Sequence, residues 1–292
     1  MSKKKLISIV AVVVVALISA LFGWIKGFFN KPEPVEGQCI VHYVDVGQGD
    51  CTVIECGGEY VLIDAGENGN EEDVFAYLDT LGVEKFKYVI ATHPHSDHIG
   101  GLAEVITEYE VENVIMPKLT RDQTPTTKTY NDFLEAVRAS GAKGIYSKVG
   151  ESYTVGDAKF TILGPVNNET DNLNDMSVAV KLVHGENSFL FTGDAEYEEE
   201  HDILGTSADL DCDVYNVGHH GSGTSSSYDL LNAVTPEICI ISCGEDNSYG
   251  HPHENAVERL ENFTDEIYRT DLCGDIVVTS DGENLSVTYE NQ

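Results

Sequence analysis

The stretch Thr92-His93-Pro94-His95-Ser96-Asp97-His98-Ile99-Gly100-Gly101 places three histidines and one aspartate within six consecutive residues. Residues 87–91, just before it, form an apolar run that is typical of a buried strand. Residues 99–109, at its end, have the apolar spacing of an amphipathic helix. The cluster is therefore predicted to lie on a loop between a strand and a helix, where several side chains can converge on one point.

Imidazole and carboxylate groups together are typical ligands of zinc and similar divalent ions. His93 and His95 are alternate residues, so both can reach the same ion. Asp97 and His98 lie at the start of the expected helix and can reach a second ion. The order and density of these residues favour a metal site over a polar loop that happens to contain histidines.

The N-terminal residues predict a membrane anchor. Three lysines at residues 3–5 precede an apolar run over residues 6–25, and its 20 residues are enough to cross the hydrocarbon core as a helix. Because lysines before such a run favour the cytoplasmic side, the rest of the chain is expected to be extracellular. We predict a single-pass anchor in residues 1–30. The alternative is a cleaved signal peptide and a secreted protein, but Ser19 and Ala20 form a poor cleavage site.

Composition changes sharply after the apolar run. Residues 31–38 contain two prolines and are read as a linker, so residues 39–292 are expected to form the globular domain. The first 31 residues hold five of the 17 basic residues and no acidic ones, which leaves 12 basic against 50 acidic residues, a balance of −38, in the rest. Such a surface repels polyanions and provides no sequence-independent attraction to nucleic acid.

Strand and helix patterns alternate through the globular part. The strands are expected at residues 40–46, 52–55, 60–63, 159–163, 178–183, 189–192, 214–217, 238–242, 276–279 and 285–289, and the further helices at residues 71–81, 130–139, 197–204, 226–234 and 254–263. Each half is a group of strands followed by strand–helix units. This order predicts two packed sheets with helices on their outer faces.

Further candidate ligands follow strands in the second half. Asp194 ends an apolar strand, where one carboxylate can bridge two ions, although an isolated aspartate there would more often cap a turn or a helix. His219 and His220 follow another strand, and adjacent histidines point in different directions, so at most one of them should bind a given ion. His251 lies in a loop before a helix, in Tyr249-Gly250-His251-Pro252-His253.

Taken in order, these motifs resemble the metallo-β-lactamase superfamily and, more narrowly, the C-terminal hydrolase domain of ComEC-type competence proteins. The resemblance covers about residues 39–289. The motifs that carry it are Val44-Asp45-Val46-Gly47-Gln48-Gly49-Asp50, Leu62-Ile63-Asp64-Ala65-Gly66, the cluster at residues 93–98, Asn174-Asp175-Met176-Ser177, Thr192-Gly193-Asp194, residues 217–222, Tyr249-Gly250-His251-Pro252 and Tyr268-Arg269-Thr270-Asp271. It implies an α/β fold, a four-layer αββα sandwich, here preceded by the predicted transmembrane helix.

The resemblance also implies a site for two divalent metal ions at the shared edge of the sheets. The matching motifs imply that His93 and His95 bind the first ion and that Asp97, His98 and His219 bind the second. They also imply that Asp194 bridges the two ions. His219 is preferred because the family's ligand follows the glycine that ends the strand; the choice between it and His220 remains open. Asp64 is expected to support the metal loop.

The chain departs from many superfamily members at one ligand. They provide a third histidine to the first ion, whereas only His184 lies between the cluster and Asp194, in a predicted hairpin turn away from the site. The matching position is Asn174-Asp175, a replacement that ComEC-like members share. Because an oxygen donor weakens the preference for zinc, the two ions are expected to be zinc or manganese. The departure also argues against a β-lactamase.

Two neighbouring ions lower the pKa of a shared water and stabilise charge on a phosphoryl oxygen, which predicts a phosphodiesterase or nuclease. Asp97, His220 and His251 are the expected catalytic residues; His251 would donate to the phosphate or protonate the leaving oxygen. The expected partners are a phosphodiester such as single-stranded DNA, the membrane, and a DNA-uptake machinery. The alternatives are a hydrolase of small phosphodiesters, lactones or thioesters, and a non-catalytic metal-binding surface protein. The sequence leaves substrate, native metal and oligomeric state open.

Overall fold

The computed structural model describes residues 36–291. The anchor expected in residues 1–30, and most of the expected linker, lie outside the described residues. Over residues 36–291, no helix combines the length and the apolar character needed to cross a membrane. The first strand, β1, begins at Cys39.

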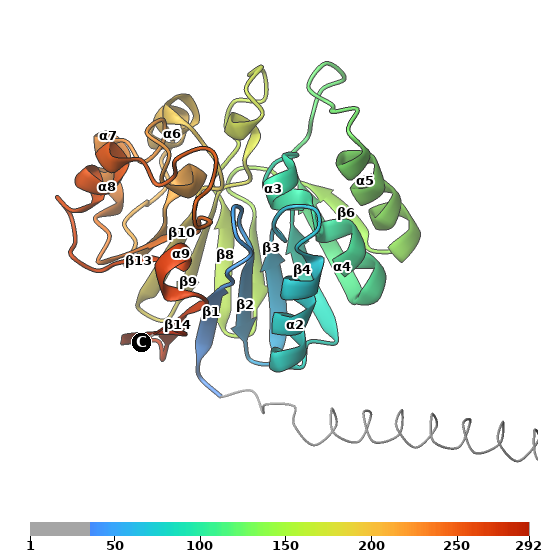
Figure 1. Ribbon diagram of the computed structural model, residues 1–292, viewed down its shortest axis with the longest axis horizontal. Coiled ribbons are helices and arrows are strands. Elements are labelled where there is room, and N and C mark those ends of the chain that lie inside the picture. The colour runs from blue at the N-terminus through green and yellow to red at the C-terminus, as the bar shows by residue number, and fades with distance from the viewer. Residues whose placement is uncertain (1–35, 292) are drawn as a thin grey trace, which may run out of the picture.

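Two mixed sheets form the centre of the molecule (Figure 1). The eight-stranded sheet has the order β15 (Leu285–Tyr289), β14 (Ile276–Ser280), β1 (Cys39–Tyr43), β2 (Thr52–Cys56), β3 (Glu59–Ile63), β4 (Lys85–Ile90), β5 (Glu110–Met116), β6 (Lys143–Tyr146). The seven-stranded sheet has the order β13 (Ile267–Arg269), β12 (Ile238–Ile241), β11 (Val214–Asn216), β10 (Asn187–Phe191), β9 (Val180–His184), β8 (Ala158–Ile162), β7 (Ser152–Val155).

The helices are short and follow the parallel strands. They are α2 (Glu71–Leu81), α3 (Ser96–Ile99), α4 (Leu102–Glu108), α5 (Lys128–Ser140), α6 (Tyr197–Leu204), α7 (Tyr228–Val234), α8 (Glu254–Leu260) and α9 (Thr270–Cys273), with single 3-10 turns η1 (Asn174–Met176) and η2 (Gly218–Gly221). The helix predicted at residues 71–81 is confirmed with the same bounds.

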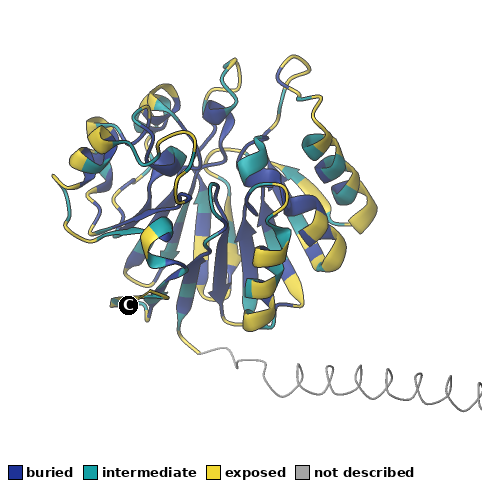
Figure 2. Cartoon of the chain, in the orientation of Figure 1, coloured by how far each residue is buried: buried dark blue, intermediate teal, exposed yellow. Residues whose placement is uncertain are grey.

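Three apolar clusters hold the layers together. Between the sheets, Tyr43 of β1 stacks on Phe191 of β10 with ring centroids 6.2 Å apart, inside a core to which both sheets contribute. A second cluster joins the eight-stranded sheet to α2, α4 and α5, and a third joins the seven-stranded sheet to α6, α7 and α8. Burial follows the same layers, since the strands are mostly buried and the helices expose their outer faces (Figure 2). The predicted αββα layering is therefore present.

The sequence patterns missed or merged some elements. β5, β6 and β13 were not expected, although β5 is a central strand of its sheet. The helix expected at residues 99–109 is divided into α3 and α4 at Gly100 and Gly101. A Cβ on Gly100 would lie 2.3 Å from the backbone nitrogen of Asn68, so the chain approaches too closely for any side chain there.

Strand direction brings the candidate residues to one edge of the sandwich. β3, β4, β5 and β6 are parallel in one sheet, and β10, β11, β12 and β13 are parallel in the other. The loops that follow β3, β4, β10 and β11 carry Asp64, the histidine cluster, Asp194 and the His219–His220 pair. Ligands that are far apart in sequence thus meet between the two sheets.

Candidate metal centre

Asp64 fixes the orientation of the histidine loop. It follows β3 with a positive φ of 56° and is fully buried. Its carboxylate accepts hydrogen bonds from the backbone nitrogen of Thr92 at 2.9 Å and from Nδ1 of His98 at 2.7 Å. Because Nδ1 of His98 is held in this way, its Nε2 is directed toward Asp194. Asp64 therefore supports the loop, as the sequence predicts, and leaves Nε2 of His98 free to bind a cation.

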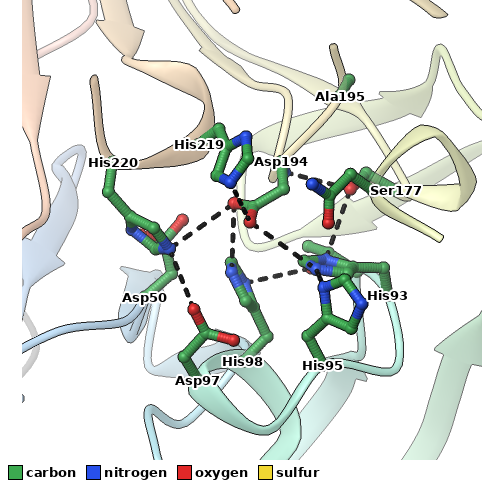
Figure 3. Close-up of polar contacts among 12 residues, drawn as sticks. Asp50, His93, His95, Asp97, His98, Ser177, Asp194, Ala195, His219 and His220 are labelled. Atoms are coloured by element: carbon green, nitrogen blue, oxygen red, sulfur yellow. Dashed lines mark hydrogen bonds and ion pairs between the residues drawn. The ribbon is translucent and has the colours of Figure 1, made fainter. Parts of the chain in front are cut away.

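Asp194 lies at the centre of the cluster (Figure 3). Its backbone nitrogen donates to Oγ of Ser177 at 3.0 Å, and a Cβ on the preceding Gly193 would lie 2.9 Å from that same oxygen. Its Oδ1 is 3.1 Å from Nε2 of His98, and its Oδ2 is 3.7 Å from Nε2 of His93. One carboxylate thus faces both halves of the histidine cluster.

His219 and His220 point in different directions, and both have a left-handed backbone, with φ of 52° and 54°. The buried His220 places Nε2 3.4 Å from Oδ2 of Asp97 and 3.6 Å from Oδ1 of Asp194. Its Nδ1 donates to the backbone oxygen of Ser242 at 3.0 Å. His219 is more exposed, with Nε2 3.6 Å from Oδ2 of Asp194.

The structure brings together two sets of side chains, each able to hold a metal ion, that share Asp194. One set is His93, His95 and Asp194, and the other is Asp97, His98, Asp194 and His220. In the second set, Nε2 of His98, Nε2 of His220 and Oδ1 of Asp194 are buried and make no well-aligned hydrogen bond, although the first and last of these atoms are only 3.1 Å apart. Buried polar atoms are normally satisfied, so this convergence fits a bound cation. The geometry favours His220 in the position for which the sequence favours His219.

The charges within the cluster are strongly coupled. Burial opposes a charge on His220, but the carboxylates of Asp194, Asp50 and Asp97 outweigh it and raise the pKa of His220 to about 10. Burial likewise opposes a charge on Asp194, but His98, His220 and His93 hold its pKa well below the usual range. A divalent cation bound here would replace protons on these imidazoles, so metal affinity is expected to weaken as pH falls.

Asp50 and Ser177 position the cluster, although their residue types alone predict no role for either of them. Oδ1 of Asp50 lies 3.2 Å from Nδ1 of His220, and its Oδ2 accepts a hydrogen bond from Asn216 at 3.3 Å. The neighbouring Gly49 has a φ of 141° and approaches the loop so closely that a Cβ would lie 2.3 Å from the backbone oxygen of Asp97. The signal was present, since Asp50 and Ser177 end two of the motifs that carry the family resemblance.

Asn174 and Asp175, which the sequence matches to the missing third histidine, have different surroundings. Asn174 is the one that faces the site. It lines the cleft beside the metal groups, and its Oδ1 is buried without a partner. Asp175 is used differently, because its carboxylate accepts hydrogen bonds from the backbone nitrogen of Glu196 at 2.9 Å and from Asn172 at 3.0 Å. His184 is on β9, where Nδ1 bonds Oγ of Ser280 at 2.8 Å, so it lies outside the site as expected.

A cleft of about 580 Å³ opens over the metal groups. His95, Asp97 and Asp194 lie at its lining together with His251. The ring centroid of His251 is 5.4 Å from that of His219, and burial followed by repulsion from His220 and His219 lowers the pKa of His251 to about 4. The structure therefore gathers the site residues predicted from the sequence around Asp194. His95, Asp97, Asp194, His219, His220 and His251 line the cleft, whereas His93 and His98 are fully buried beside Asp194.

The fold and the paired ligand sets define a class of protein. The chain belongs to the metallo-beta-lactamase superfamily, whose family model matches residues 44–245. Two solved structures support the same fold. CmlA, a diiron beta-hydroxylase from Streptomyces venezuelae, has a TM-score of 0.56 and 16% identity, and the match covers 89% of this chain and 55% of that chain. YhfI from Bacillus subtilis has a TM-score of 0.50 and 14% identity, and the match covers 79% of this chain and 95% of that chain.

Within the superfamily, three of the curated relatives are ComEC-type competence proteins. ComE operon protein 3 of Bacillus subtilis is 28% identical over 82% of this chain and 33% of its own length. Recombination protein 2 of Haemophilus influenzae is 31% identical over 85% of this chain and 29% of its own length. Competence protein ComA of Neisseria gonorrhoeae is 28% identical over 86% of this chain and 34% of its own length. The chain spans about a third of the length of these relatives.

Proposed function

We propose that this chain is a binuclear metal-dependent hydrolase that cleaves phosphodiester bonds. The observation that carries the proposal is the pair of ligand sets that share Asp194, with buried, unpartnered atoms converging in the second of them. The first ion is assigned to His93, His95 and Asp194, with Oδ1 of Asn174 as an oxygen donor, and the second to Asp97, His98, Asp194 and His220.

Two divalent ions held there, zinc or manganese, would lower the pKa of a water and offset negative charge on two phosphoryl oxygens. The protein's own groups then orient the substrate. His251 has a pKa of about 4, so near neutral pH it is an uncharged imidazole that can donate one hydrogen bond. This property suits hydrogen bonding to a phosphoryl oxygen better than proton transfer to a leaving group. His219, on the same side of the cleft, can provide a second contact of this kind.

A hydrolysis screen with metal analysis tests the proposal. The full chain is loaded with zinc or manganese and assayed on a bis-aryl phosphodiester, a lactone and a thioester. We expect two ions per chain and phosphodiester hydrolysis that a chelator abolishes and either metal restores. Lactone or thioester hydrolysis without phosphodiester hydrolysis would refute the substrate class. Two bound ions without any hydrolysis would favour a non-catalytic metal-binding protein.

The competence relatives support DNA as the polymer substrate and a role beside a DNA-uptake machinery. The balance of −38 in residues 32–292 limits its affinity for long polyanions. We therefore expect weak cleavage of single-stranded DNA whose apparent affinity stays level or improves as salt rises from low to moderate concentration. A steep loss of affinity with salt would instead indicate a basic groove and counterion release. The acidic surface favours a second candidate substrate, a small phosphodiester.

We further propose that the catalytic domain is extracellular and is held by the N-terminal apolar run. The support is the three lysines before that run, which favour the cytoplasmic side. Protease added to intact cells should digest the domain. Protection until the membrane is broken would reverse the orientation, and release of a soluble protein with a new N-terminus near residue 21 would favour a secreted form.

A further inference from the structure

We propose that Tyr249 provides a stacking surface for an unpaired nucleobase beside the phosphate that is cleaved. This inference rests on the proposed phosphodiesterase function. Tyr249 lines the cleft and is 64% exposed, which is unusual for a large aromatic side chain. One side of its ring packs on His251, with centroids 5.6 Å apart and an angle of 21° between the planes. Much of the ring is therefore available to a ligand that enters the cleft.

The ring belongs to a series that leads from the cleft mouth to the metal groups. Tyr249 stacks on His251, His251 packs edge-on against His219 at 5.4 Å, and Nε2 of His219 is 3.6 Å from Asp194. A base on Tyr249 would thus lie a few side chains away from the carboxylate that joins the two metal sets. This separation suits a base and the phosphate attached to its sugar.

The loop that carries Tyr249 is held before any ligand binds. The side chain of Asn247 donates to the backbone oxygens of Gly244 at 2.9 Å and His251 at 2.5 Å, and its Oδ1 accepts from the nitrogen of His251 at 3.0 Å. Gly244 itself packs so closely on the loop before β2 that a Cβ would lie 2.6 Å from the nitrogen of Gln48. Since the loop is already ordered, stacking would cost little conformational entropy.

The lining of the cleft selects the class of ligand. None of the described residues that line it is lysine or arginine, so charge attraction from side chains contributes little to binding a nucleotide. Tyr249 is also the single phenylalanine, tyrosine or tryptophan among those residues, which argues against an aromatic cage for a quaternary ammonium group. A lone open aromatic face suits the flat surface of a base, and the base must be unpaired to reach it.

Kinetics with paired substrates test the inference. The metal-loaded full chain is assayed on a thymidine dinucleotide and on the same phosphodiester with both bases removed. Base stacking is worth about 1–3 kcal/mol, so Y249A should raise KM for the dinucleotide by roughly 5- to 150-fold and change KM for the base-free dimer little. Y249F keeps the ring and should behave as the parent. Y146A is the matched control, because Tyr146 is 62% exposed on β6 and lies outside the cleft.

Different kinetic results would contradict the stacking role of Tyr249 in different ways. An unchanged KM for the dinucleotide in Y249A, or an equal rise for both dimers, would overturn the stacking role. A rise confined to an aryl phosphorylcholine would also overturn it, in favour of a cationic headgroup. If the parent hydrolyses neither dimer, anisotropy of a labelled thymidine trimer in chelator decides the inference alone. The proposed function itself fails only if the bis-aryl phosphodiester is not hydrolysed either. Weaker binding by Y249A than by Y146A would support stacking, and equal binding would overturn it.

Discussion

The two halves of the molecule contribute to the cleft in different ways. In the half built on the eight-stranded sheet, His93, His95, Asp97 and His98 come from one loop after β4. In the other half, Asp194 and His220 come singly from the ends of β10 and β11. The first set is a property of a short sequence, whereas the second exists only when two parallel strands lie side by side. The halves should therefore respond differently to substitution.

The largest effect is expected at Asp194, because it is the one residue shared by both ligand sets. D194A should reduce bound metal from two ions to fewer than one per chain at micromolar metal, and hydrolysis by at least about a thousandfold. Stability of the metal-free protein should change less, since Asp194 lies outside the three apolar clusters. Metal analysis and thermal melting check both outcomes. A D194A protein with two ions and normal turnover would show that the halves do not meet at this carboxylate.

The next effect separates His220 from its neighbour His219. H220A should lose one of the two ions and about a hundredfold or more in rate, because it removes a buried ligand of the second set. H219A should keep both ions and lose less than about tenfold, since His219 lies farther out and would contact substrate. Metal analysis of the two variants side by side is the measurement. The reverse order would restore the assignment that the sequence favours.

His219 and His220 show what could not be predicted from the sequence, namely which of two adjacent histidines faces the metal groups. The loop after β4 was predicted with its strand, and the two-sheet fold followed from the order of strand and helix patterns. Which of two adjacent histidines faces the metal groups depends on φ of 52° and 54° at those residues, and no side-chain pattern encodes that angle. Family resemblance favoured His219, whereas the left-handed turn directs His220 inward.

Long-range contacts account for the other omissions. Strand β5 was missed because its residues alternate between acidic and apolar only in part, and its place beside β4 decides its structure. Asp50 was part of a recognised motif, yet its role depends on His220, which is 170 residues later in the chain. The role of Ser177 likewise depends on where Asp194 lies. Local patterns predicted the elements, and contacts between the halves assign the supporting residues.

A smaller effect compares the residues that orient one histidine in each half. D64N should weaken metal affinity about 10- to 100-fold, because Asp64 is the buried carboxylate that accepts from Nδ1 of His98. D50N should weaken it less, since Nδ1 of His220 also donates to the backbone oxygen of Ser242. Competition with a chromophoric chelator measures both. Equal losses would mean that the backbone contact does not hold His220, and the halves would then be alike in this respect.

The smallest effect concerns stability in the second half, away from the metal groups. Glu199 of α6 is buried and accepts a hydrogen bond from the backbone nitrogen of Val166 at 2.7 Å. Burial outweighs this bond and raises the pKa of Glu199 to about 8. A carboxyl whose pKa is raised by folding favours the folded state below its ordinary pKa, and that contribution is lost as pH rises through the folded value.

Between pH 5 and pH 8 the native protein should therefore lose stability relative to E199Q, which keeps an acceptor for Val166 but cannot ionise. The difference should be on the order of 1 to a few kcal/mol, measured by urea unfolding at both pH values. E198Q, at the exposed neighbouring position on the same helix, is the control and should follow the native protein. Parallel pH profiles for all three proteins would show that Glu199 is ionised throughout, with the hydrogen bonds from the backbone nitrogens of Val166 and Asn167, at 2.7 and 3.4 Å, outweighing burial.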